Sequence, residues 1–155
     1  MKQSVHIYDQ EAVEYDHGTS MSKGCPFCAL EGYEIVARNR LAVAIYDKFP
    51  VSSGHILVIP RRHFADYFDA TDEELRAIAQ LLRKSRAILL QERSPDGFNI
   101  GINIGAAAGQ TVFHLHVHLI PRYAGDHPQP AGGVRHVIPG KGYYDHCCGR
   151  GLAKI

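Results

Sequence analysis

Several features of other protein classes are missing from this sequence of 155 residues. It has no tryptophan and no apolar run approaching the roughly 20 residues that a membrane-spanning helix requires. Residues 1–6 lack the apolar core of a secretory signal. The 17 basic and 16 acidic residues leave a net charge of +1, which favours neither a nucleic-acid nor a membrane partner. These absences predict a cytoplasmic protein with one globular domain.

Cysteine is also scarce, and its positions carry information. Cys25 and Cys28 form a C-x-x-C pair, whereas Cys147 and Cys148 are adjacent and fit poorly to a mutual disulfide. In a reducing compartment the first pair indicates metal binding or redox chemistry, with reduced, partly buried thiols as the plain alternative. A redox motif should follow a buried strand, but residues 18–24 are not strand-like, so redox chemistry is the weaker interpretation.

The pattern of apolar residues predicts an α+β fold with a mainly antiparallel sheet of five strands and one long helix. The helix begins after Thr71, which forms a capping-box pattern with Glu74, and ends near Arg93. Its predicted apolar face comprises Leu75, Ile78, Ala79, Leu82 and Leu89. The strands are expected at residues 33–38, 41–46, 55–60, 98–104 and 111–120.

Ten histidines are present, and three of them alternate in the run His114-Leu115-His116-Val117-His118. In a strand, alternate residues share a face, so the three imidazoles would lie opposite the apolar set Phe113, Leu115, Val117 and Leu119. Imidazoles aligned in this way suit nucleophilic attack with neighbouring groups that stabilise charge. A metal site and a chance surface pattern are the alternatives from the pattern alone.

A loop of small residues, 105–111, precedes the histidine run. Glycine and alanine allow backbone N–H groups to approach a phosphate closely, and Thr111 adds a hydroxyl donor. A tight connection between two strands would explain the same composition. Because the loop adjoins three histidines, we interpret it as a phosphate-binding segment.

The run from Gly109 to Arg122, GQTVFHLHVHLIPR, closely resembles the signature of the histidine triad (HIT) family. Asp47, the segment GHILVIP at residues 54–60 and Arg62-His63 resemble the N-terminal half of that family, so the resemblance covers residues 25–123. The stretch from Gly125-Asp126 to Tyr143 is similar to tails of microbial members with dinucleoside-polyphosphate hydrolase or related labels. The expected organisation is an arm at 1–24, the HIT domain at 25–123, and a tail at 124–155 packed on the domain or on a dimer partner.

The resemblance implies covalent catalysis at the α-phosphate of a nucleotide. His116 would be the nucleophile, the backbone carbonyl of His114 would orient it, and His118 and Thr111 would contact phosphate oxygens. Asp47 would accept hydrogen bonds from ribose hydroxyls, Asn103 would donate to a phosphate or bridging atom, and Gln110 would reach the leaving side. The full expected nucleotide-binding set is Asp47, His55, Asn99, Asn103, Gly109, Gln110 and Thr111.

The resemblance also implies a structural zinc site in which His63 and His114 complete the pair Cys25 and Cys28. Four protein ligands leave no open position for substrate, so the role would be structural. No organic cofactor is expected. The remaining histidines, His6, His17, His127, His136 and His146, are expected at the surface.

The resemblance implies a homodimeric hydrolase or transferase. Its expected substrates are AMP- or GMP-containing phosphoramidates, nucleotidyl adducts or dinucleoside polyphosphates, cleaved through a nucleotidyl-histidine intermediate. A nucleotide-binding regulatory module with little turnover is the alternative.

Overall fold

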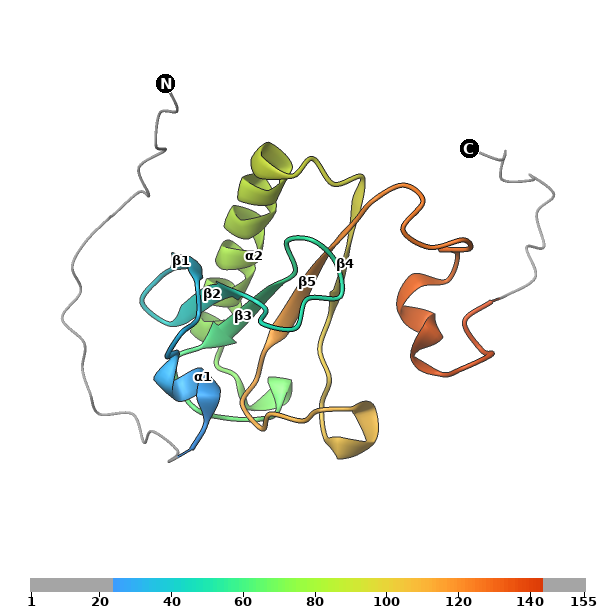
Figure 1. Cartoon of the computed structure of the whole chain (residues 1–155). Helices are drawn as coiled ribbons and strands as arrows, with labels where there is room; N and C mark the ends of the chain where they lie inside the picture. Colours follow the sequence, from blue (N-terminus) through green and yellow to red (C-terminus); the bar gives the residue numbers. More distant parts are fainter. Residues whose placement is uncertain (1–23, 144–155) are drawn as a thin grey trace, which may run out of the picture.

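The computed structural model describes residues 24–143, coloured in Figure 1. The expected N-terminal arm, apart from Gly24, lies outside the described residues. So do Cys147, Cys148, His6, His17 and His146. No helix of the described part is both long and apolar enough to cross a membrane.

A five-stranded sheet forms the centre of the fold, and every neighbouring pair of strands is antiparallel. The order across the sheet is β1-β2-β3-β5-β4. The strands span Ile35–Arg38 (β1), Ala42–Tyr46 (β2), Ile56–Pro60 (β3), Gly97–Gly101 (β4) and Val117–Arg122 (β5). The predicted fold class of one antiparallel sheet with one long helix is therefore confirmed.

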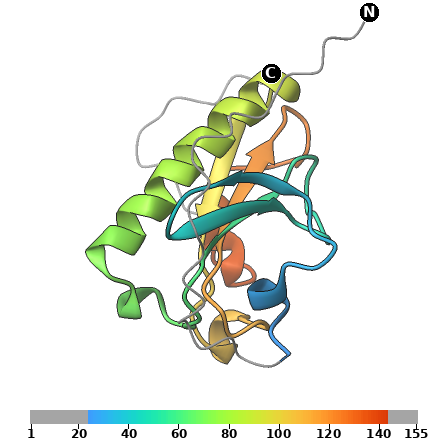
Figure 2. The ribbon, with the colours of Figure 1, turned by 90° about the vertical axis from the view of Figure 1, so that its left-hand side faces the viewer.

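The long helix α2, Asp72–Glu92, covers one face of the sheet (Figures 1 and 2). The side chain of Thr71 accepts a hydrogen bond from Glu74 N, and Glu74 returns one to Thr71 N, so the predicted capping box is present. Its buried face includes Ala77, Ile78, Leu81 and Leu89, whereas Ala79 is exposed, contrary to prediction. Leu81, which the predicted face leaves out, is buried in the core that α2 forms with the sheet.

The two faces of the sheet have different coverings. On the α2 face, alternate residues of the strands and Leu115, Val117 and Leu119 form the main core. On the opposite face, a smaller apolar cluster joins β2 and β3 to the short helix α1, Pro26–Ala29. Because both faces of β2 and β3 are covered, their sequences are continuously apolar rather than alternating.

Two predicted strands are shorter than expected. β4 ends at Gly101, so residues 102–104 lie outside it, and β5 begins only at Val117. His114 and His116 therefore precede the strand, in an irregular segment that Leu115 N anchors to Phe64 O at 2.6 Å. Leu115, Val117 and Leu119 are buried as predicted, but Phe113 is 54% exposed. The alternating pattern extends N-terminal of β5, but residues 111–116 form no strand because the segment bonds to the loop at Phe64 instead of a neighbouring strand.

The second face also carries the start of the tail. Residues 133–137 form a short 3-10 helix, η3, beside β4 and on the side of the sheet away from α2 (Figure 1). The face of the sheet away from α2 thus carries α1 over β2 and β3, the histidines at β5, and η3 beside β4.

Candidate active site and metal centre

Two cysteines and two histidines meet beside the N-terminal end of β5. The ligand atoms of Cys25, Cys28, His63 and His114 all lie within 4.8 Å of one another. Cys28 Sγ is 3.3 Å from His63 Nδ1 and 3.6 Å from His114 Nδ1, and Cys25 Sγ is 3.5 Å from His114 Nδ1. The two Nδ1 atoms are 3.3 Å apart. The segment between and after the two cysteines forms helix α1, which is followed by Leu30 in a left-handed conformation.

These spacings fit a tetrahedral metal site. For Zn–N and Zn–S bonds of ordinary length, tetrahedral geometry places two nitrogens about 3.3 Å apart and a nitrogen and a sulfur about 3.5 Å apart. The observed separations of 3.3–3.6 Å match both values. The residues therefore fit a zinc ion, with two thiolates and two imidazoles and no position left for water.

Backbone carbonyls select the tautomer of two triad histidines. His114 Nε2 lies 2.8 Å from Pro60 O and donates to it, which leaves the lone pair of Nδ1 facing the two cysteines. His116 Nδ1 lies 2.8 Å from His114 O and donates to it, which leaves the lone pair on Nε2. The pKa of His114 is lowered to about 4, mainly by burial, so its ring is neutral near pH 7.

His116 is enclosed by aromatic neighbours. Its ring packs edge-on against Phe27 with centroids 5.1 Å apart, and it lies 5.1 Å from the ring of His118. Phe27 lies between the two cysteines in sequence and also contacts His114, at 6.2 Å. Helix α1 thus joins the metal site to His116. Sequence reasoning missed Phe27, because its only signal is its position inside the C-x-x-C pair.

His118 belongs to a polar row that ends at Asp47. His118 Nδ1 is 3.0 Å from His55 Nε2, and His55 Nδ1 is 3.2 Å from Asp47 Oδ2. Burial is the main cause that lowers the pKa of His55 and brings that of His118 to about 4; the neighbouring His116 contributes to both shifts. His118 Nε2 is buried and has no hydrogen-bond partner within residues 24–143. The row therefore presents one unused imidazole nitrogen beside the His116 ring.

The loop before the histidines is held from inside the protein. Gln110 is 4% exposed, and its Oε1 accepts from Gly105 N while its Nε2 donates to Ala65 O. Both the oxygen and the nitrogen of this amide thus bond to the backbone. The sequence had predicted instead that Gln110 would extend toward the leaving group. Gly109 takes the left-handed conformation, φ 85°, that closes the turn. Thr111 is exposed and Asn103 half-buried.

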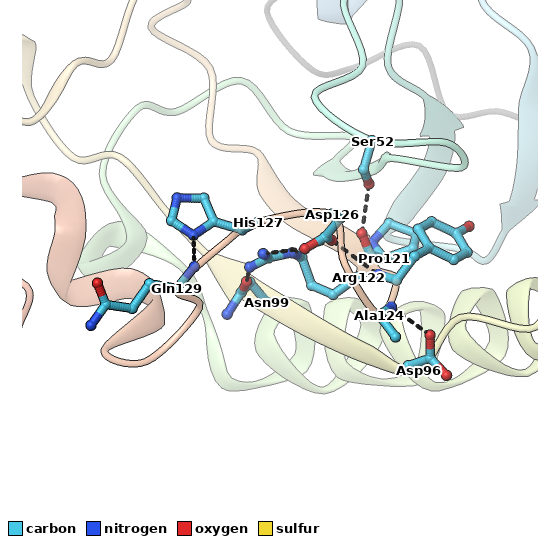
Figure 3. A network of polar contacts seen from close by, with 10 residues as sticks. Ser52, Asp96, Asn99, Pro121, Arg122, Ala124, Asp126, His127 and Gln129 are labelled. Carbon is cyan, nitrogen blue, oxygen red and sulfur yellow. Dashed lines mark hydrogen bonds and ion pairs between the residues drawn. The ribbon is translucent and has the colours of Figure 1, made fainter. Parts of the chain in front are cut away.

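The side chain of Asn99 bonds to Arg122. Its Oδ1 accepts from Arg122 Nη1 at 2.6 Å, and the same guanidinium forms two bonds of 2.7 Å to Asp126 (Figure 3). Both Asn99 and Arg122 line a cavity of about 370 Å³ that also includes His127 and His136. His127 is exposed as predicted, but His136 is half-buried and donates from Nε2 to Ala131 O at 2.8 Å, which corrects the prediction of a surface residue.

Comparison with known proteins identifies the family of this chain. Residues 32–125 match the model of the HIT domain, more than half of the chain. The chain therefore belongs to the HIT domain family. It is 35% identical over 121 residues to the AP-4-A phosphorylase of Mycobacterium tuberculosis, covering 74% of this chain and 62% of that protein. It is 39% identical over 95 residues to the asymmetrical bis(5'-nucleosyl)-tetraphosphatase of Schizosaccharomyces pombe, covering 61% and 52%.

Solved structures agree with the sequence comparison. The zinc-bound histidine triad family protein of Mycobacterium smegmatis matches with a TM-score of 0.62 and 35% identity, over 66% of this chain and 78% of that one. The chain spans less than two thirds of the two enzymes named above.

Proposed function

We propose that this protein is a nucleotide hydrolase or transferase that cleaves at an α-phosphate through a nucleotidyl-histidine intermediate. The observation that carries the proposal is the bond from His116 Nδ1 to His114 O, because it leaves a lone pair on Nε2 for attack. The two relatives whose names refer to AP-4-A and to a nucleosyl tetraphosphate support a dinucleoside polyphosphate as the substrate class.

In the proposed reaction, His116 Nε2 forms a bond to the α-phosphorus while the bond from phosphorus to the leaving group breaks. The leaving group departs with that electron pair. A water molecule then attacks the same phosphorus, loses a proton, and releases His116. Splitting one displacement into two in this way makes each step easier.

His118 is the proposed contact for the phosphate oxygens. The bond between His55 Nε2 and His118 Nδ1 requires one of the two nitrogens to carry the proton. When His55 carries it, the neutral His118 carries its own proton on Nε2 and donates it to a phosphate oxygen. Because His118 Nε2 is shielded from solvent, its hydrogen bond to a phosphate oxygen would be stronger in the transition state than a bond exposed to water.

Asp47 is the proposed ribose contact. Its Oδ1 accepts from Phe49 N at 3.0 Å, which orients the carboxylate while lone pairs remain for ribose hydroxyls. Asn103, Gly109 and Thr111 are proposed for the phosphate chain. Gln110 acts differently from the sequence expectation: it holds the loop that positions them.

The proposed metal is a structural zinc ion held by Cys25, Cys28, His63 and His114. When bound, it would join helix α1 to the segment before β5 and supply no reactive ligand position. The reducing compartment that the sequence predicts keeps the thiols available as ligands.

A homodimer is proposed from the family resemblance. β4 is an edge strand of the sheet, and its Ile100 side chain is 52% exposed, which is compatible with pairing to a second copy. Light scattering coupled to size-exclusion chromatography measures the mass directly, and a monomeric mass at micromolar concentration would contradict this proposal.

A hydrolysis panel in ¹⁸O-labelled water tests the proposed function. It contains diadenosine and diguanosine tetraphosphates together with adenosine and guanosine phosphoramidates. We expect AMP or GMP as a product, with the label on that nucleotide because water attacks its α-phosphorus. Label found only in the other product would contradict α-phosphate attack. Nucleotide binding without turnover of any compound would instead favour the regulatory binding module.

A further inference from the structure

The backbone of the loop between β3 and α2, residues 61–70, supports the segments around the histidines. This loop lies at the same end of the molecule as the loop before the histidines (Figures 1 and 2). Phe64 O accepts a hydrogen bond from Leu115 N at 2.6 Å, and Ala65 O accepts one from Gln110 Nε2 at 3.0 Å. The two segments that would approach the phosphates are thus both attached to this loop.

The bond from Leu115 to Phe64 acts on the group that orients the proposed nucleophile. Leu115 N and His114 O belong to the same peptide group, which is planar, with its N–H and C=O pointing in opposite directions. Phe64 O therefore fixes the direction of His114 O, which accepts from His116 Nδ1 at 2.8 Å. Hydrogen bonds in such a chain polarise one another, so each strengthens the next.

Arg62 packs against Phe64 from the outer side of the loop. Its guanidinium carbon lies over the Phe64 ring, 4.1 Å from the ring centroid. Phe64 is 7% exposed and belongs to the main core, as Leu115 does. Arg62 Nη2 also donates to Asp69 O at 2.9 Å, so one guanidinium joins both ends of the loop.

Glu74 holds the guanidinium in place over the ring. Arg62 Nε donates to Glu74 Oε1 at 2.9 Å, and Nη2 donates to Oε2 at 2.8 Å. Glu74 is 4% exposed and also accepts from Thr71 N, so the first turn of α2 fixes it. This pairing lowers the pKa of Glu74 and raises that of Arg62, so both groups stay charged. A forked pair sets the plane of the guanidinium as well as its position.

We propose that Arg62 is a positioning residue: it fixes Phe64, and through Phe64 the peptide oxygen that orients His116. The inference rests on the proposed function and adds to it a side chain that acts at a distance from the substrate. Through this chain of contacts, the first turn of α2 influences the orientation of the His116 ring.

Arg62→Lys tests the proposal by kinetics. The variant keeps a positive charge beside the buried Glu74, which protects the fold, but an ammonium lacks the planar fork that lies flat over the Phe64 ring. The kcat and KM values are measured with each compound of the hydrolysis panel that the wild type cleaves. We expect kcat to fall about three- to tenfold, the effect of one weakened cation–π contact, with KM unchanged.

Phe64→Met is the second variant. It keeps the backbone carbonyl and an adaptable apolar side chain in the core but removes the ring beneath the guanidinium. The same fall in kcat at constant KM is expected, because the two substitutions weaken the same contact from its two sides.

The ring nitrogens of His116 provide a readout that a loss of stability alone would not change. In protein labelled with ¹⁵N-histidine, NMR should show a protonated Nδ1 for His116 in the wild type, and comparison with His116→Gln identifies its signals. In Arg62→Lys, both ring signals should move toward the average of the two tautomers, because the carbonyl that selects one of them is held less firmly.

Arg86→Lys is the matched control, because Arg86 is exposed on α2 and lies over the Phe98 ring at 5.7 Å. This variant and Gln80→Ala, at another exposed position of α2, should match the wild type. An unchanged kcat in Arg62→Lys and Phe64→Met, a rise in KM alone, or unmoved His116 signals would overturn the positioning role. A wild type that cleaves no compound would contradict the proposed function, while the NMR comparison would still decide the role of Arg62.

Discussion

His114 contacts His116 through its backbone and the cysteine pair through its ring. His114 O accepts from His116 Nδ1 at 2.8 Å, while His114 Nδ1 lies 3.5 Å from Cys25 Sγ. One residue thus links the metal site to the orientation of its neighbour. The three histidines consequently have three different environments: a ligand set, an aromatic enclosure and a polar row.

Replacing His116 tests the nucleophile. In His116→Ala, the release of AMP from adenosine phosphoramidate should fall to the background rate, because no other histidine ring within residues 24–143 has its Nε2 freed by a backbone carbonyl in this way. Circular dichroism checks that the variant remains folded. Turnover close to that of the wild type would remove His116 from the reaction, whereas Gln80→Ala should retain full activity.

Metal analysis tests the zinc site. The purified protein should carry about one zinc ion per chain, and Cys28→Ser should lose most of it because one thiolate of four ligands is missing. Chelation should also lower the melting temperature, since metal binding stabilises the folded state. Cys147→Ser is the matched control and should keep its zinc. Metal-free protein after reconstitution with zinc would contradict the proposal.

Phe27 is expected to position the His116 ring. Phe27→Leu keeps an apolar side chain in the small core but removes the edge contact at 5.1 Å. We expect kcat to fall about three- to tenfold, in line with the free energy of one aromatic pair, with KM and zinc content little changed. Phe68→Leu, at a position 82% exposed, is the control. An unchanged kcat in Phe27→Leu would limit Phe27 to packing.

The stability of the fold should depend on pH through His118. Its pKa is about 4 in the folded protein and about 6.5 in an unfolded chain, so protonation favours unfolding. The contribution is complete above pH 6.5 and is lost as the pH falls toward 4. The groups facing this ring are His55, His116 and, through His55, Asp47.

Urea unfolding at pH 5 and pH 7.5 measures this effect. The wild type should lose more unfolding free energy between the two conditions than His118→Gln, whose side chain does not titrate. Taking the difference between the two proteins cancels the other buried histidines, such as His55 and His114. Equal losses in the two proteins would show that His118 is not held neutral by the fold.

The fold could be predicted from local patterns because those patterns report local physics. The capping residues Thr71 and Glu74 begin α2 where expected, and the apolar runs at 42–46 and 56–60 form the central strands. The alternation of Leu115, Val117 and Leu119 correctly indicates their burial. It does not locate the start of β5, because a strand requires a partner, and residues 111–116 have none.

The sequence by itself determined the types of reactive group and their family resemblance, since His114, His116 and His118 are close in the chain. Only the tertiary structure decided what each one contacts. Cys25 meets His114 across 89 residues, and His55 meets His118 across 63. Periodicity indicates on which side of the chain a group points, but not which distant segment packs there. For the same reason, Phe27 beside His116 and the cavity at Asn99 become visible only in the folded chain.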